Sequence, residues 1–147
     1  MNNDDLALAG TPKAVKISGG MLALAGGFGV LHVIQIWFSL VFLVTLPLVL
    51  WIVMTLAAIA CVVFGIGFSR ARSWAVWPSI PSAAVLWLVG AGWFVYAFVH
   101  GYLNLFGFIV PFLSFVAIIS LAFSVSSCMR TARARERLSS EGIDLGV

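Results

Sequence analysis

The chain has 147 residues, of which 63% are hydrophobic and only 9% are charged, and its mean hydropathy is +1.15. Soluble domains carry about 25% charged residues, and a soluble fold of this size has too little interior to hide so much apolar surface. The composition therefore excludes a soluble globular domain. The net charge of +3 does not indicate nucleic-acid binding, because no basic stripe with interleaved aromatic residues is present to follow a phosphate backbone.

All Lys and Arg residues fall into three short clusters, and two long stretches without any charged residue separate the clusters. These stretches cover residues 17–69 and 73–129. As a continuous helix each would be about 80 Å long, more than twice the hydrocarbon thickness of about 30 Å. Each stretch is therefore expected to fold back on itself. We predict an all-α integral membrane bundle of four transmembrane helices, arranged as two helical hairpins.

The predicted elements follow in chain order. Residues 1–15 form a polar cytoplasmic N-terminal arm, in which Thr11-Pro12 indicates a helix start. Pro78 and Pro81 are expected to bracket the start of the third span, and Pro111 to kink the fourth or mark its true beginning. A four-span membrane domain covers 16–129, with spans at about 16–37, 46–68, 78–100 and 105–128, and a basic cytoplasmic tail covers 130–147. This tail is expected to stay helical to Arg137 and to fray from Ser139 onward.

The three basic clusters precede the first span, join the second to the third, and follow the fourth. The four spans therefore place every Lys and Arg on one side of the bilayer. The positive-inside rule assigns this side to the cytoplasm, so both termini are expected there. Trp74 and Trp77 fall at the predicted inner interface and Trp37 at the outer one, where Trp is enriched. We expect the location to be the cytoplasmic (plasma) membrane, which is the inner membrane of a bacterial cell.

Small residues recur on one face of the first span. Gly19, Ala23 and Gly27 are spaced by four residues, a pattern that lets two helix backbones approach closely. Two interpretations stay open. The face packs against another span of the same chain, or it forms a contact between subunits.

Apart from Lys16 at the edge of the first span, no Asp, Glu, Lys or Arg lies in a predicted span, and all five Asp and Glu residues lie in the tails. Ion pumps, proton-coupled transporters and many membrane enzymes keep such groups in the membrane because their function requires them. The chain also lacks a P-loop and the HExxH, GxSxG and CxxC motifs. We therefore predict a protein that is not an enzyme.

Polar and aromatic residues gather in the outer half of the predicted bundle. His32 and Gln35 lie one turn apart on the first span, and two histidines at similar depth are a candidate for haem, metal or quinone binding. The alternative is that these are interfacial residues, bonded to neighbours, water or lipid headgroups. The tentative ligand pocket consists of His32, Gln35, Trp93, Tyr96, His100 and Asn104.

Six arginines surround the predicted cytoplasmic rim. Basic residues at this depth set membrane topology and also attract anionic headgroups. In one interpretation the arginines only set the membrane topology. In the other they form a site for an acidic lipid or an acidic partner. The residues are Arg70, Arg72, Arg130, Arg133, Arg135 and Arg137.

These patterns lead to one main functional hypothesis and one alternative. The main hypothesis is a non-enzymatic accessory, assembly or scaffold subunit that acts through helix–helix contacts, with itself or another membrane protein as partner in the lipid bilayer. No cofactor or metal is expected. The alternative is an oligomeric channel or transporter, or a protein that binds a small ligand such as haem, quinone or lipid in the outer pocket.

Overall fold

The structure of the protein is a computed structural model that describes residues 10–38, 48–101 and 105–141. Within these ranges it contains four helices and no strand: α2 (Lys13–Phe38), α4 (Leu48–Ser69), α5 (Ser73–Val99) and α6 (Leu105–Ser140). Each helix is long and apolar enough to cross a membrane. The prediction of an all-helical chain with four helices of membrane-spanning length is confirmed.

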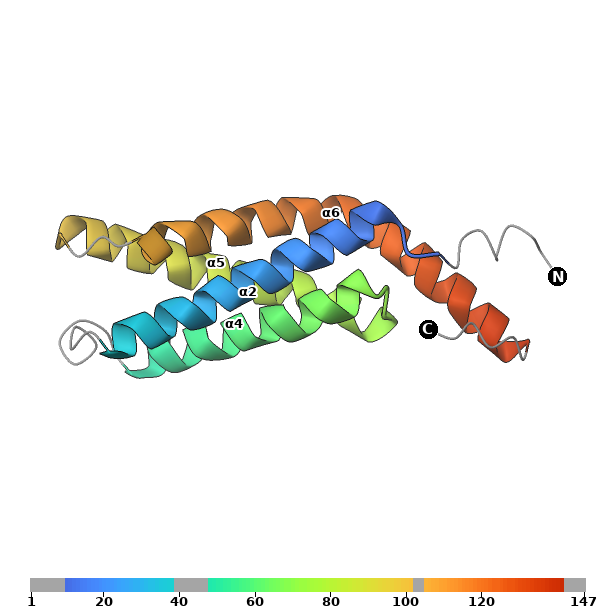
Figure 1. Cartoon of the computed structure of the whole chain (residues 1–147), viewed down its shortest axis with the longest axis horizontal. Coiled ribbons are helices and arrows are strands. Elements are labelled where there is room, and N and C mark those ends of the chain that lie inside the picture. The colour runs from blue at the N-terminus through green and yellow to red at the C-terminus, as the bar shows by residue number, and fades with distance from the viewer. Residues whose placement is uncertain (1–9, 39–47, 102–104, 142–147) are drawn as a thin grey trace.

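Each helix runs antiparallel to the next one along the chain (Figure 1). α2 packs against α4 and α6, and α5 packs against the same two helices. α2 and α5 face each other diagonally and make little contact. Helices that are consecutive in sequence are therefore neighbours in space, and the contact between α2 and α6 closes the four-helix bundle.

The three basic clusters lie at the same end of the bundle, which we call the basic end. The starts of α2 and α5 meet the end of α4 there, and α6 continues past them and bends away from the bundle (Figure 1). The sequence predicted helix as far as Arg137 and fraying from Ser139. The helix instead extends to Ser140, so Ser139 and Ser140 belong to it.

The start of the third helix differs from the prediction. α5 begins at Ser73, so Pro78 and Pro81 lie inside the helix rather than at its start. The N–H groups that these prolines lack would have bonded to the carbonyls of Trp74 and Trp77, and both of these residues are exposed at the basic end. The helix therefore lacks two hydrogen bonds in its first turns, at the basic end. Pro111 is likewise inside its helix, which begins at Leu105.

The turn between α4 and α5 explains why α5 begins so early. The N–H of Ala71 bonds to the carbonyl of Phe68 at 2.8 Å, and the N–H of Arg72 bonds to that of Gly67 at 3.0 Å. This pair of bonds is a Schellman motif, which ends a helix with one residue in the left-handed region. Ala71 occupies that position with φ of 52° and has a buried side chain. The next helix starts two residues later.

Arg135 of α6 ties the basic end together. Its guanidinium donates one hydrogen bond of 2.7 Å to the carbonyl of Arg70, and another of 2.7 Å to the hydroxyl of Thr11. The first bond caps the end of α4 with a cation, which is favourable beside unsatisfied carbonyls. One side chain thus links the segment before α2, the end of α4 and the extension of α6.

Glycines bring the backbones of α2 and α4 into direct contact. A Cβ added at Gly65 would lie 2.6 Å from the nitrogen of Ala23, and one added at Gly26 would lie 2.5 Å from the carbonyl oxygen of Ala58. A Cβ added at Gly19 would lie 2.6 Å from the carbonyl oxygen of Gly65. No larger residue fits at these three positions. Small residues on both helices thus set the distance between them.

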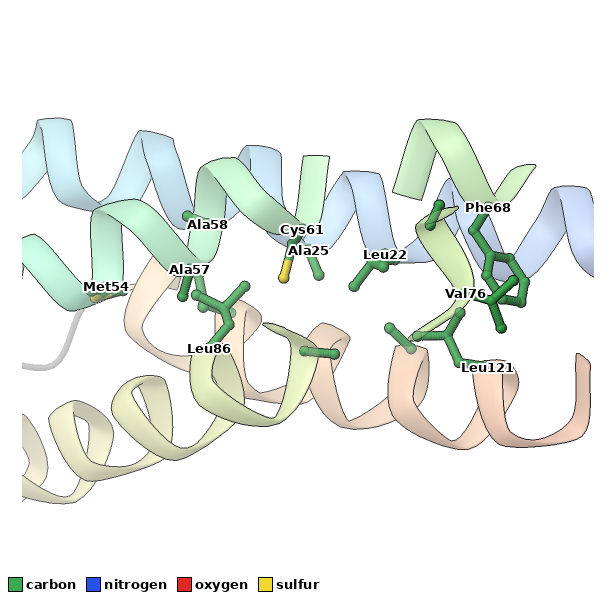
Figure 2. Packing of buried hydrophobic residues seen from close by; sticks show 14 of the residues in the cluster. Leu22, Ala25, Met54, Ala57, Ala58, Cys61, Phe68, Val76, Leu86 and Leu121 are labelled. Atoms are coloured by element: carbon green, nitrogen blue, oxygen red, sulfur yellow. The ribbon is translucent and has the colours of Figure 1, made fainter. Parts of the chain in front are cut away.

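The core beside this contact is made of small and medium side chains. Figure 2 shows Ala25, Ala58 and Cys61 where α2 and α4 run side by side, with Leu86 of α5 beside Ala57 and Leu121 of α6 beside Val76. These side chains are buried. In lipid the dense packing of such residues, rather than the hydrophobic effect, holds helices together.

We expect Gly19→Val to lower the free energy of unfolding by about 1–3 kcal/mol or more, because the added side chain meets backbone atoms of α4 that cannot move aside. Gly92→Val on α5 is the matched control, because a Cβ there meets nothing within 4 Å. Unfolding in detergent, followed by circular dichroism, measures both. Equal losses in the two variants would show that α2 and α4 are not in close contact.

Candidate functional site

Five aromatic side chains form a connected group near the end opposite the basic end, and we call them the aromatic cluster. Their ring centroids are separated by 6.2 Å for His32 and Trp93, 5.5 Å for Trp51 and Trp93, 5.7 Å for Trp93 and Tyr96, and 4.1 Å for Tyr96 and His100. The cluster draws on α2, α4 and α5. Trp93 is its centre, since it contacts three of the other four rings.

His32 is the most unusual member of the aromatic cluster. Its side chain is 0% exposed, and neither ring nitrogen makes a hydrogen bond of good geometry to any described residue. The side chain of Gln35, one turn along the same helix, lies beside the imidazole, and Gln35 itself is exposed. A buried polar group without a partner costs about 1–3 kcal/mol. The indole nitrogen of Trp93 is also buried and has no partner among the described residues.

The pocket residues predicted from the sequence are only partly brought together. His32, Trp93, Tyr96 and His100 are joined in one series of rings. His100 is exposed, and its Nδ1 lies 2.9 Å from the carbonyl oxygen of Tyr96, one turn earlier on α5. The rings of Trp93 and Tyr96 follow one another between the two imidazoles, so the histidines do not face each other directly. Asn104 lies outside the described residues.

Trp51 was missed by the sequence reasoning. It is buried on α4 and packs edge-on against Trp93. Its position near the start of α4 matches the depth of His32 near the end of the antiparallel α2. Comparing the predicted membrane depth of aromatic residues on the second span with that of His32 and Trp93 would have identified it.

The predicted small-residue face of α2 divides between two surroundings. Gly19 and Ala23 meet α4, and Gly26, which the pattern did not include, meets it as well. Gly27 has open space in front of it and lines an apolar groove of about 560 Å³. The other residues along this groove are Ala23, Leu24, Phe28, Val30, Leu31 and, from α4, Val62.

The six predicted rim arginines do not form one patch. Arg135 is used for the bonds to Arg70 and Thr11, whereas Arg70 and Arg72 are exposed on the turn. Arg130, Arg133 and Arg137 are exposed on α6. Helix geometry separates these three from Arg135, because two positions along a helix correspond to a rotation of about 200° and five positions to about 140°.

Three serines form a polar contact between α2 and α6 that the sequence reasoning did not identify. The hydroxyl of Ser18 lies 2.7 Å from the hydroxyls of both Ser120 and Ser124, and it donates to the carbonyl of Ala14 at 2.8 Å. The spacing of four residues between Ser120 and Ser124 places both on one face of α6, and this pattern could have indicated the contact. Because these hydroxyls satisfy one another, the contact joins the two helices.

The described residues do not form a metal site. No group of three or more His, Cys, Asp or Glu residues among them is placed to hold a metal ion. Comparisons with protein-family models, with curated proteins and with solved structures give no match.

We expect His32→Phe to leave the stability of the ligand-free protein unchanged or to raise it slightly, because removal of the imidazole nitrogens breaks no bond to the described part of the chain. Ser18→Ala is the matched control on the same helix, and it should lower the free energy of unfolding by about 0.5–1.5 kcal/mol as its hydrogen bonds are lost. Thermal unfolding in detergent measures both variants. A clear loss of stability in His32→Phe would contradict the expectation and show that the imidazole has a polar partner.

Proposed function

We propose that the protein is a non-enzymatic membrane subunit that acts through helix–helix contacts, and that α2 carries the contact surface. The support is a line of residues on the outward face of α2, which we call the α2 seam. It consists of Ile17, Gly20, Leu24, Gly27, Leu31 and Ile34. The four large residues are exposed by 46–58%, and a Cβ added at either glycine would meet nothing within 4 Å.

The spacing of the α2 seam supports this interpretation. Its members alternate by three and four residues, which is the seven-residue repeat of helices that pack side by side. Leu24 and Leu31 project as knobs, whereas Gly20 and Gly27 leave holes beside them. A surface that carries both features is complementary to a copy of itself, as a two-fold interface requires. The first partner we propose is therefore a second copy of this chain.

The lipid-facing sides of α4 and α6 lack this combination, and α5 has only one open glycine, Gly92, between its exposed side chains. The exposed face of α4 carries only branched side chains, such as Ile52, Leu56 and Ile59, and that of α6 carries several Phe residues. Large side chains suit contact with lipid but hold a partner backbone away. Close approach of two membrane helices requires small residues. Among the four helices, α2 is the one with two glycines open to the outside.

We further propose that the basic end faces the cytoplasm, with both termini on that side. The support is the gathering of every Lys and Arg at one end of the bundle. The described part of the opposite end carries none of them.

Cysteine labelling in intact cells and in inverted vesicles tests this orientation. A membrane-impermeant maleimide is expected to label Ser73→Cys only in inverted vesicles, and Leu105→Cys only in intact cells. Ser73 and Leu105 are exposed at opposite ends of the bundle, and the native Cys61 and Cys128 are buried, so the background should be low. The reverse labelling pattern would contradict the orientation.

Cross-linking in native membranes tests the α2 seam. Leu24→Cys is expected to give a covalent dimer on oxidation, and Ile59→Cys, similarly exposed on α4, is expected to stay monomeric. Adding Gly27→Leu to Leu24→Cys should remove most of the dimer, because the new side chain fills the hole in the seam. Adding Gly92→Leu, which also points into open space, should not.

Two outcomes would overturn the proposed function. One is equal cross-linking from Leu24→Cys and Ile59→Cys, which would indicate random collision. The other is a pair of results. The Leu24→Cys dimer forms to the same extent when Gly27→Leu is added, and the wild-type chain retains no other protein on purification.

A second candidate function is the binding of a small ligand at the aromatic cluster. It is favoured by the buried nitrogens of His32 and Trp93, which have no partner among the described residues. A ligand with two hydrogen-bond acceptors, such as a quinone, would accept from the indole N–H of Trp93 and from one imidazole N–H of His32. In this case protein purified in mild detergent carries an organic molecule, detectable by mass spectrometry, which His32→Phe releases.

A further inference from the structure

We propose that the outward face of α6 binds an anionic phospholipid of the leaflet at the basic end. The face is a line of residues that we call the α6 stripe: Ile119, Phe123, Ser126, Arg130, Arg133 and Arg137. All six are exposed, and their spacing of four and three residues places them on one side of the helix. The proposal requires only that the bundle lies in a membrane, and it does not depend on the α2 seam.

The chemistry of the α6 stripe changes once along its length. Ile119 and Phe123 are apolar, and Phe123 is 82% exposed. Ser126 follows, and the next three members are arginines. A phospholipid has the same order of chemistry, with apolar chains below a charged phosphate. The α6 stripe therefore matches one lipid along its axis, with the chains against Phe123 and the phosphate at Arg130 and Arg133.

Arg135 fixes the depth and the direction of the α6 stripe. Its bond to the carbonyl of Arg70 holds this part of α6 level with the end of α4. Arg133 and Arg137 lie two positions to either side of Arg135 and so point about 200° away from it. Because Arg135 faces the turn between α4 and α5, the arginines of the stripe face away from the bundle. At this level, the surroundings on that side are the headgroups of the leaflet.

The three guanidinium groups of the α6 stripe are available for a ligand. In the part of the chain that the structure describes, none of them takes part in an ion pair, and Arg130 makes only a 3.4 Å bond from Nε to the carbonyl of Ser126. Glu141 follows Arg137 by one turn, and its backbone N–H bonds to the Arg137 carbonyl, but the described side chains of the two residues form no ion pair. Arginine presents two parallel N–H groups that match phosphate oxygens. Three such groups on one face favour an anionic headgroup over a zwitterionic one.

Native mass spectrometry of the full chain in a neutral detergent tests the proposal, with phosphatidylglycerol and phosphatidylcholine as probes. We expect phosphatidylglycerol to be retained more tightly. The triple variant Arg130→Gln/Arg133→Gln/Arg137→Gln should bind it about 100-fold more weakly, since each arginine near an anionic surface contributes about fivefold. Equal retention of the two lipids by the wild-type protein would overturn the proposal.

A second triple variant separates a built site from general charge attraction. Lys13→Gln/Lys16→Gln/Arg72→Gln removes the same charge from exposed positions at the same end of the bundle but leaves the α6 stripe intact. It should keep most of the affinity for phosphatidylglycerol. Equal losses in the two triple variants would overturn the proposal. Unchanged thermal midpoints are expected in both, because every substituted side chain is exposed.

Three further arms identify the source of the anion. Phe123→Ala should weaken phosphatidylglycerol binding, because the acyl chains lose their contact. Inorganic phosphate in excess should not displace the lipid, and displacement would assign the site to free phosphate instead. Tighter binding of polyglutamate than of phosphatidylglycerol would assign the α6 stripe to an acidic protein and overturn the proposal.

Discussion

The direct backbone contact between α2 and α4 is the constraint on which the rest of the bundle depends. Gly19, Gly26 and Gly65 have no room for a side chain, so the observed register of the two helices depends on these glycines. This register turns the remaining face of α2 outward, with Gly20 and Gly27 open. One helix thus uses one set of glycines for its own fold and presents another set to its surroundings. The α2 seam exists because the internal contact fixes the rotation of α2.

Polar groups inside the bundle mostly satisfy themselves locally. The hydroxyl of Thr55 donates to the carbonyl of Trp51, and that of Ser114 to the carbonyl of Val110, each at 2.7 Å. Such bonds hide a polar group within its own helix, as a lipid environment requires. Ser18 extends the pattern to a second helix. His32 and Trp93 are exceptions among the described residues, and this contrast supports the aromatic cluster as a second candidate site.

The basic end shows how one side chain combines structural and surface roles. Arg135 caps α4 and holds Thr11, and by doing so it sets the rotation of the α6 extension. The remaining arginines of α6 then face outward at the level of the turn. Basic residues that appear equivalent in the sequence thus have different surroundings. One is part of the fold, and three form an exposed line along the helix.

The sequence by itself determined the helical class, the number of helices and their approximate limits, because the charge-free stretches and the thickness of a bilayer leave few alternatives. It did not determine that α5 begins before Pro78, since a Schellman turn at Ala71 depends on backbone geometry rather than on a typical residue pattern. The spacing of Gly19, Ala23 and Gly27 indicated a packing face, but only the tertiary structure decided that Gly27 points outward and Gly26 inward. Four-residue spacing drifts by about 40° each time around a helix of 3.6 residues per turn, so rotation is set by the neighbouring helix. The same reason applies to Trp51 and to Arg135, whose roles depend on contacts between helices that are distant in sequence.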